Sequence, residues 1–203
     1  GDGDGLSIGG NHLVHCLRRN VDVKILLFNN RVYGLTKGQY SPTSLPGHRT
    51  KSSPVGSVDY ALKPLSVALG TEATFVARTQ DTNTKHLSEM LRRAASHKGT
   101  AFIEIFQNCV VYHPTAWEHT TNPDSREENT LFLEDGQPLI FGKNKDKGIR
   151  LNGMDPEVVS LGRGIEKSEL LVHNEGLEST NYAFMLSRME HPSFPLPFGV
   201  LRA

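Results

Sequence analysis

The sequence predicts an α/β domain in which a parallel sheet is flanked by helices in three layers. Three short apolar runs, at residues 22–28, 74–78 and 101–106, have the pattern of strands that are covered on both faces. Stretches with helical spacing of apolar residues separate these runs, and this alternation is typical of right-handed crossovers between parallel strands. Such folds bind ligands at the carboxyl ends of their strands, so the loops that follow the runs are the first candidates for a site.

Helices are predicted before and between these strands. Residues 8–19 carry apolar side chains at helical spacing and end in basic residues, which suit a helix C-terminus. Residues 64–70 begin with a proline, which fits a first helical turn, and we expect Gly70 to end this helix in a left-handed conformation. Residues 84–98 have a continuous apolar stripe and predict a third helix.

The pattern weakens after residue 114, which predicts a domain at residues 1–114 and a C-terminal extension at residues 115–203. Within the extension, residues 130–142 resemble a hairpin. Residues 177–189 predict one more helix, and a proline-rich segment follows it. At 203 residues the chain is long enough to bury a substantial core.

Composition excludes several classes of partner. The formal net charge is zero, from 22 basic and 22 acidic residues, so no overall field attracts the chain to nucleic acid or to an anionic membrane. No apolar run approaches the roughly 18 residues that a membrane span needs, and the N-terminus does not resemble a signal peptide. Two cysteines cannot form a disulfide framework. We therefore expect a cytoplasmic protein that binds neither nucleic acid nor a membrane.

The opening GDGDG places two carboxylates between glycines. A calcium loop of the EF-hand type is one interpretation of Asp2 and Asp4, but the register excludes it. The fifth, sixth and twelfth positions counted from Asp2 are Leu6, Ser7 and Leu13, where that loop needs an oxygen ligand, glycine and glutamate.

A second interpretation joins Asp2 to Asn30, which follows the first predicted strand. Neighbouring parallel strands lie about 5 Å apart, so a carboxylate and an amide at adjacent strand ends would share one cation. Hard oxygen ligands with a single charge suit Mg²⁺ that also binds a phosphate, and Gly3 and Gly5 would let the backbone approach that phosphate. Taken singly, each motif also fits an ordinary turn.

The two motifs together resemble the diphosphate-binding motif of thiamine diphosphate enzymes. Twenty-five residues separate Gly3 from Asn29, as that motif requires. The stretch YGLTKGQYSPTS and the later EATFVAR extend the resemblance to the β subunit of 2-oxoacid:ferredoxin oxidoreductases over most of residues 1–114. The tail, above all NTLFLEDGQPLIFGKNKDKGIRL, resembles the longer subunits of the 2-oxoglutarate type. The resemblance implies the thiamin-diphosphate-binding fold.

The resemblance also implies a role for each motif residue. Asp2 and Asn30 would hold Mg²⁺ through their side chains, and Val32 would add its backbone carbonyl. Gly3 and Asp4 would contact the diphosphate of the cofactor. No catalytic glutamate is expected, because in this family it belongs to the other thiamine-binding domain.

The loop that follows lies where the family places thiazolium and substrate. Tyr33 and Gly34 would contribute to cofactor binding, and the implied catalytic residues are Leu35, Thr36 and Lys37. Leu35 would lie against the reacting carbon. Lys37 would attract a substrate carboxylate, or else it is a solvated loop lysine.

Cys109 matches the position at which these β subunits supply the last of four thiolates to a 4Fe-4S iron-sulfur cluster. The other three come from an N-terminal segment that these 203 residues do not include. A lone cysteine is more often a buried inert thiol, and Cys16, within a predicted helix, keeps that interpretation.

The implied reaction is oxidative decarboxylation of a 2-oxoacid, here 2-oxoglutarate, to an acyl-CoA, with electrons passed to ferredoxin. The implied cofactors are thiamine diphosphate, Mg²⁺ and the cluster, and the implied partners are an α subunit, ferredoxin, the 2-oxoacid and coenzyme A. Because a strand should precede GDGDG, we expect an N-terminally incomplete chain that is inactive by itself. Two alternatives remain open: a nonredox thiamine diphosphate decarboxylase or synthase, and a noncatalytic assembly subunit of the same fold.

Overall fold

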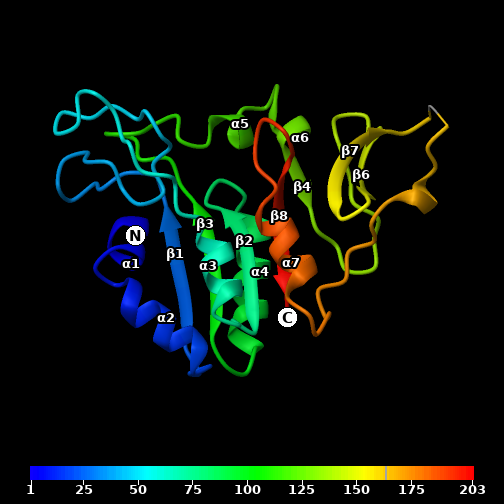
Figure 1. Cartoon of the computed structure of the whole chain (residues 1–203), viewed down its shortest axis with the longest axis horizontal. Coiled ribbons are helices and arrows are strands. Elements are labelled where there is room, and N and C mark those ends of the chain that lie inside the picture. Colours follow the sequence, from blue (N-terminus) through cyan, green and yellow to red (C-terminus); the bar gives the residue numbers. More distant parts are fainter. Residues whose placement is uncertain (163) are drawn as a thin grey trace.

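The computed structural model describes residues 1–162 and 164–203, which form two sheets with helices on both faces of the larger one (Figure 1). The larger sheet has five strands in the order β1-β3-β2-β8-β4 and the smaller has three in the order β5-β6-β7. In the larger sheet the strands are β1 (Lys24–Asn29), β3 (Ala101–Phe106), β2 (Phe75–Gln80), β8 (Leu196–Arg202) and β4 (Thr130–Phe132). In the smaller they are β5 (Ile140–Phe141), β6 (Lys147–Asn152) and β7 (Asp155–Ser160).

The three strands predicted from apolar runs are confirmed as β1, β2 and β3, each shifted by no more than two residues. They are parallel, and Ala101 at the start of β3 aligns with Lys24 of β1 and Phe75 of β2. Every residue of β2 and β3 is buried, as expected of strands covered on both faces. The same expectation is wrong for β1, whose Leu26 and Phe28 are exposed. The α/β fold with a flanked, mostly parallel sheet is therefore confirmed.

Helices on opposite faces give the domain its three layers. Successive side chains of β3 alternate between two cores, because a strand points them to opposite faces. Phe102 packs in the core of α2 (Gly10–Arg18), α3 (Pro64–Gly70) and α7 (Asn181–Ser187). Ile103 packs on the other face, against the side of α4 (Thr84–Ser96) that carries Met90 and Ala94.

The expected left-handed residue at Gly70 is wrong. Thr71 caps α3 instead, and its hydroxyl donates to the carbonyl of Ala68 at 2.9 Å. The positive φ falls on Glu72, at 63°. A side-chain hydrogen bond to the last turn thus takes over the carbonyl that a glycine cap would have satisfied.

The GDGDG segment, expected to be a loop, forms the short helix α1 (Asp2–Leu6). The amide of Gly5 donates to the carbonyl of Gly1 at 2.9 Å, which closes its first turn. Two glycines did not prevent this turn because α1 packs against β1 and buries Asp2, Gly3 and Leu6.

The hairpin expected at residues 130–142 is wrong, because its two halves join different sheets. β4 pairs in parallel with β8, whereas β5 pairs with β6. The proline-rich C-terminal segment, which predicted no element, provides β8, and β8 runs antiparallel to β2. The division at residue 114 stays a prediction. The remaining helical turns are α5 (Glu118–Thr121), α6 (Arg126–Asn129) and a 3-10 helix at Lys167–Glu169.

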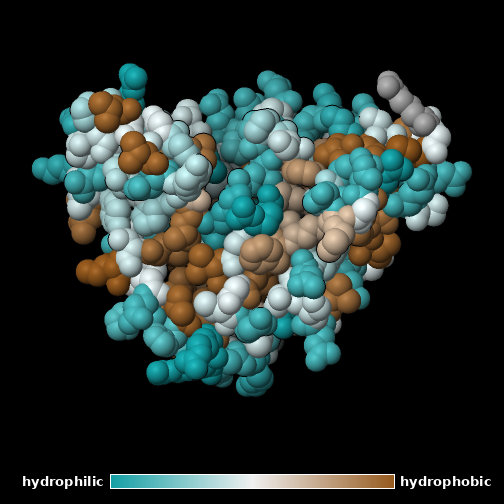
Figure 2. Space-filling model, viewed as in Figure 1, coloured by the Kyte–Doolittle hydropathy of each residue, from teal (hydrophilic) through white to brown (hydrophobic). Residues whose placement is uncertain are grey.

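β1 lies at one end of the larger sheet and has no strand on its outer side within the described part of the chain. Leu26 and Phe28 on β1 are each 41% exposed. Figure 2 shows apolar surface over the region of α2, β1 and α3. Among the described helices, none is both long and apolar enough to cross a membrane.

Candidate active site

The site is built where α1 meets the carboxyl end of β1. Asp2, in the first turn of α1, is 1% exposed, and its Oδ1 accepts a hydrogen bond of 3.4 Å from the backbone amide of Asn30. The packing of α1 on β1 therefore brings together the carboxylate and the amide residue that the sequence paired.

Two hydroxyls that sequence reasoning missed hold the second oxygen of Asp2. Oδ2 of Asp2 accepts from Oγ of Ser41 at 2.6 Å and from Oγ1 of Thr43 at 2.7 Å. Both hydroxyl residues are buried. They lie in the SPTS segment, and because buried hydroxyls need a partner, their role becomes apparent once the structure shows that they are buried.

The donor set fits a hard cation that shares its shell with a phosphate. Asp2 offers a carboxylate and Asn30 an amide oxygen, which here accepts from the backbone amide of Val32 at 3.3 Å. Within the described residues, no three His, Cys, Asp or Glu side chains gather as a metal site. One carboxylate with neutral oxygens is the arrangement that suits Mg²⁺ bound together with a phosphate.

Gly3 is required by its neighbour Tyr33. A Cβ at Gly3 would overlap the ring of Tyr33, whose hydroxyl donates to the Gly3 carbonyl at 2.9 Å. Asp4, the other residue expected at the diphosphate, is exposed. The structure thus joins Gly3 to Tyr33, the first residue of the expected substrate loop.

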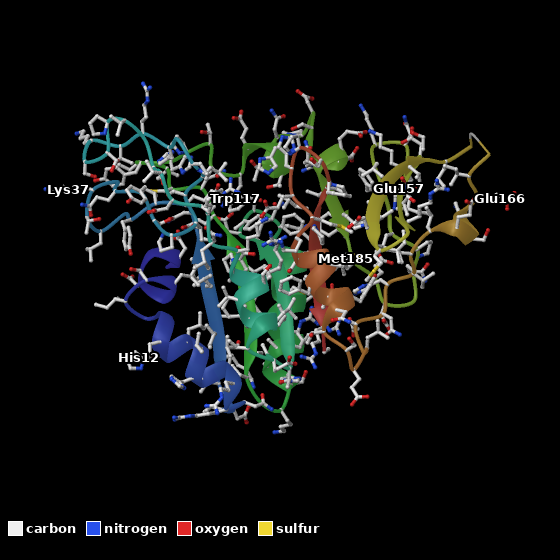
Figure 3. All side chains as sticks on the ribbon, viewed as in Figure 1. His12, Lys37, Trp117, Glu157, Glu166 and Met185 are labelled. Carbon is white, nitrogen blue, oxygen red and sulfur yellow. The ribbon has the colours of Figure 1, made fainter. Side chains whose placement is uncertain are left out.

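The rest of that loop extends into solvent. Gly34, Leu35, Thr36 and Lys37 are exposed, with Leu35 at 93%. Figure 3 shows Lys37 at the outer edge of the molecule. The described chain does not pack this loop against Asp2, so the catalytic roles of Leu35, Thr36 and Lys37 stay predictions.

Cys109 follows β3 and is half-buried, with a bridge between its backbone and that of His113. Cys16, the other free thiol, lies in α2. Four thiolates are normally needed to hold a cubane iron-sulfur cluster, so residues 1–203 do not form such a site. The role of Cys109 as one ligand stays a prediction.

A series of buried, hydrogen-bonded polar side chains leads inward from Asp2. Thr43 Oγ1 also lies 3.0 Å from Oδ1 of Asn29, and because a hydroxyl has one proton, it donates to Asp2 or to Asn29. Asn29 donates through Nδ2 to Glu104 Oε1 at 2.7 Å, and Arg78 Nε donates to Glu104 Oε2 at 2.8 Å. The charged residues within the apolar strands β2 and β3 were the sequence signal for these hydrogen-bonded side chains, and this signal was overlooked.

Arg31, which lies between the predicted magnesium ligands Asn30 and Val32 in the sequence, was also missed. Burial lowers the pKa of its guanidinium to about 10, with Glu104 and Glu190 acting in the opposite direction. It still carries a positive charge at pH 7. Its backbone adopts a positive φ of 58°, which is uncommon for a residue other than glycine.

Comparison with known proteins places these features in context. The sequence profile described as "Thiamine pyrophosphate enzyme, C-terminal TPP binding domain" matches residues 1–105. The 2-oxoglutarate oxidoreductase subunit KorB of Mycobacterium tuberculosis is 47% identical over 189 residues, which cover 93% of this chain and 50% of that protein. The β subunit of 2-oxoacid:ferredoxin oxidoreductase 1 of Aeropyrum pernix is 49% identical over 113 residues, 56% of this chain and 36% of that one.

Among solved structures, a chain of 2-oxoglutarate:ferredoxin oxidoreductase from Magnetococcus marinus, with 2-oxoglutarate, coenzyme A and succinyl-CoA bound, superposes with a TM-score of 0.69 at 27% identity. The superposition covers 99% of this chain and 54% of that one. The chain therefore spans about half the length, or less, of the relatives it matches.

Proposed function

The chain belongs to the family of thiamine pyrophosphate enzymes, and from this premise we propose that it forms the diphosphate-binding part of a thiamine diphosphate site. The whole protein is then the β subunit of a 2-oxoacid:ferredoxin oxidoreductase that acts on 2-oxoglutarate. Similarity to subunits with these names supports the proposal.

One observation carries the proposal: Asp2 and Asn30 lie together at the carboxyl end of β1, in hydrogen-bond contact. This edge of a parallel sheet is where α/β folds bind ligands. Asp2 and Asn30 would hold Mg²⁺ through side-chain oxygens, and Val32 would add its carbonyl. Gly3 would contact the diphosphate through its backbone.

When bound, thiamine diphosphate would supply the carbanion chemistry of 2-oxoacid decarboxylation, and the protein supplies placement and electrostatics. Ser41 and Thr43 donate to Oδ2 of Asp2 and so fix the direction of its other oxygen. Leu35, Thr36 and Lys37, on the exposed loop, would complete the substrate side in the assembled protein.

The redox partners are part of the same proposal. An α subunit would supply the other thiamine-binding domain, coenzyme A would accept the acyl group, and ferredoxin would accept electrons. Cys109 would provide one thiolate to an iron-sulfur cluster, whose other ligands would lie outside residues 1–203. The relative with 2-oxoglutarate and coenzyme A bound supports this choice of substrates.

Ligand substitution tests the magnesium site. In the full-length protein, Asp2→Ala and Asn30→Ala should each abolish Mg²⁺-dependent binding of thiamine diphosphate. Each change removes an oxygen ligand of Mg²⁺, so the cation is held less well and the negative charge of the diphosphate is poorly neutralised. Isothermal titration calorimetry with thiamine diphosphate, with and without Mg²⁺, measures the effect.

Asp155→Asn is the matched control, because Asp155 is an exposed carboxylate on β7, in the other sheet. It should bind thiamine diphosphate like the unchanged protein. Unchanged affinity in either site variant would contradict the assignment of that residue.

A further inference from the structure

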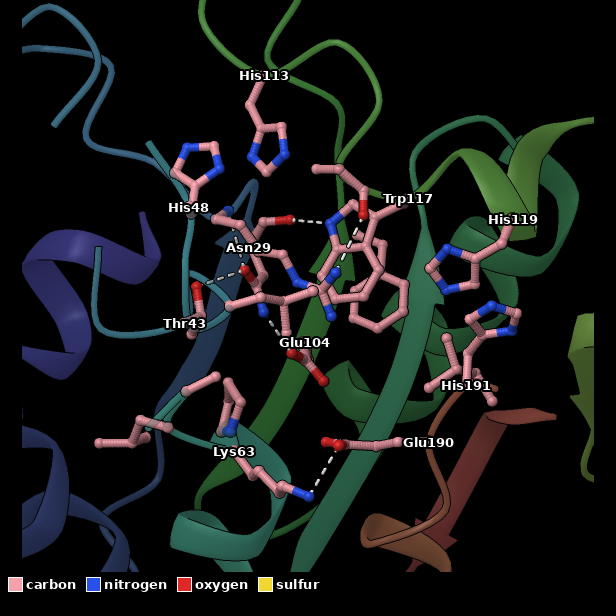
Figure 4. Close-up of a pocket in the computed structure, with 18 of the residues that line it drawn as sticks. Asn29, Thr43, His48, Lys63, Glu104, His113, Trp117, His119, Glu190 and His191 are labelled. Carbon is pink, nitrogen blue, oxygen red and sulfur yellow. Dashed lines mark hydrogen bonds and ion pairs between the residues drawn. The ribbon is translucent and has the colours of Figure 1, made fainter. Parts of the chain in front are cut away.

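A pocket of about 440 Å³ is lined in part by Asn29 and Thr43, and Asp2 is not among its lining residues. This volume is in the range of small-molecule sites. Figure 4 shows two pairs of histidines at its sides and an ion pair facing them. These residues are His48 with His113, His119 with His191, and Lys63 with Glu190.

The pocket is lined by more cationic than anionic side chains. Three cationic side chains line it against two carboxylates. Glu104 is bound by Arg78, and Glu190 by Lys63, each at 2.8 Å. Arg31 has no carboxylate partner among the described residues, and its Nη1 donates only to the carbonyl of Ala116, at 3.1 Å. A guanidinium has five N–H donors, so most of those on Arg31 are free for a ligand.

Arg31 is held in place by stacking and by its backbone. Its guanidinium carbon lies 3.7 Å from the ring centre of Trp117, and Trp117 stacks on Phe106 at 3.4 Å. The indole N–H donates to the carbonyl of Asn29 at 2.8 Å, and Ser44 donates to the carbonyl of Arg31 at 2.6 Å. Left-handed residues other than glycine persist where their surroundings fix them, and they cluster at functional sites.

The histidines add unsatisfied polar atoms. Nδ1 of His113 and Nε2 of His119 are buried without a hydrogen-bond partner in the described structure. Both residues line the pocket. Buried polar atoms normally have partners, so these two nitrogens are available to a bound group.

We propose that this pocket binds a small molecule through a carboxylate or phosphate group, which Arg31 would contact with histidine N–H groups beside it. A guanidinium with free donors suits both groups, because each presents two oxygens to its planar fork. The site is separate from the magnesium site, and the proposal does not rest on the proposed function.

Calorimetry of the full-length protein in its assembly, without thiamine diphosphate, tests the proposal. Succinate and inorganic phosphate are the two probes, and succinamide is the uncharged control. We expect saturable binding of at least one anion and none of succinamide. Binding of one anion only supports the proposal and identifies the group that the pocket prefers.

Variants locate the binding. Arg31→Gln should weaken the anion at least tenfold, because hydrogen bonds to charged groups contribute that much. His119→Ala should weaken it severalfold and keep Mg²⁺-dependent binding of thiamine diphosphate. Arg150→Gln, a control that removes a guanidinium from β6 in the smaller sheet, should leave affinity unchanged. Changed tryptophan emission on binding, lost in Trp117→Phe, would be a second supporting readout.

The proposal fails if neither anion binds, if succinamide binds equally, or if His119→Ala has no effect on the anion. It also fails if Arg31→Gln folds and binds the anion normally. His119→Ala decides the matter where Arg31→Gln does not fold. Failure of thiamine diphosphate to bind the unchanged protein would reject the proposed function alone, because the anion is measured without it.

Discussion

The hydroxyl of Thr43 lies between the two candidate sites and can donate its one proton to only one of them at a time. It lies within hydrogen-bond distance of Asp2 on one side and Asn29 on the other. A cation on Asp2 would weaken that carboxylate as an acceptor, which favours donation to Asn29 instead. Thr43→Val, which keeps the shape, would leave Asp2 with Ser41 as its side-chain donor and leave Oδ1 of Asn29 without its hydroxyl partner.

His119 makes stability depend on pH. Burial, with His191 and Arg31 nearby, lowers its pKa from 6.5 to about 4. The unfolded chain therefore binds a proton between those values that the folded chain does not, so the free energy of unfolding rises with pH across this window. Stability should fall as the pH drops from about 6.5 towards 4. Urea denaturation of the intact protein at several pH values measures it.

His119→Gln should flatten this dependence, because glutamine does not titrate. His97→Gln is a useful comparison, since burial lowers the pKa of His97 in the same direction and its ring lies in another part of the fold, where it meets Thr74. An unchanged slope in His119→Gln would show that other groups control the acid sensitivity.

Substitution of Cys109 tests whether the intact protein is a redox enzyme or a nonredox thiamine diphosphate enzyme. In the intact protein, Cys109→Ser should remove or destabilise the proposed iron-sulfur cluster and stop ferredoxin reduction, because one of its four proposed thiolates would be lost. Binding of thiamine diphosphate through Asp2 and Asn30 should survive, since the two sites use different ligands. Iron content and ferredoxin reduction measure the first effect, and calorimetry measures the second. A full iron complement with normal electron transfer would favour a nonredox thiamine enzyme.

At the scale of residues, the sequence predicted the pair of motif residues that would bind the metal. It did not predict the neighbouring side chains that hydrogen-bond to them. Asp2 and Asn30 were paired by spacing, and the structure places them in contact. Ser41 and Thr43 were within the recognised loop but gained no role, because a hydroxyl gives no sign of its partner until the fold is known. Arg31 had no signal beyond its position, since its positive φ is a property of the backbone.

At the scale of elements, continuous runs of apolar residues were the readable signal. β1, β2 and β3 are apolar runs, and each was predicted. β8 was missed because its segment contains prolines, although Pro197 lies within the strand. β6 and β7 were missed because they form a partly exposed pair with many polar residues, whose pattern resembles a loop. The predicted hairpin was wrong because closeness in the sequence does not decide which sheet a short strand joins.

The start of α4 offers a test of an element boundary. The side chain of Asn83 accepts a hydrogen bond of 3.2 Å from the backbone amide of His86, which satisfies one free donor of the first turn. Asn83→Ala should lower the free energy of unfolding by about 1 kcal/mol. Ser88→Ala, on an exposed position of the same helix, should leave it unchanged or slightly raised. Equal stability of the two variants would contradict the capping role.

At the scale of the molecule, β8 connects the C-terminal part to the main sheet. It pairs with β2 on one side and β4 on the other, and Leu201 is 1% exposed in the main core. Leu201→Ala should destabilise the protein by about 2–5 kcal/mol through lost burial and a cavity. Met154→Ala, at a position 93% exposed, should have little effect. Thermal unfolding compares them, and similar melting temperatures would contradict this role of β8.

The open side of β1 has a practical consequence for handling residues 1–203 alone. Within the described residues, the outer side of this strand has backbone donors and acceptors without a neighbouring strand, next to the exposed Leu26 and Phe28. Such an edge accepts a strand from another molecule, which makes it a seed for aggregation. Concentrated preparations of residues 1–203 should therefore lose material to insoluble oligomers, and Leu26→Lys should improve the yield.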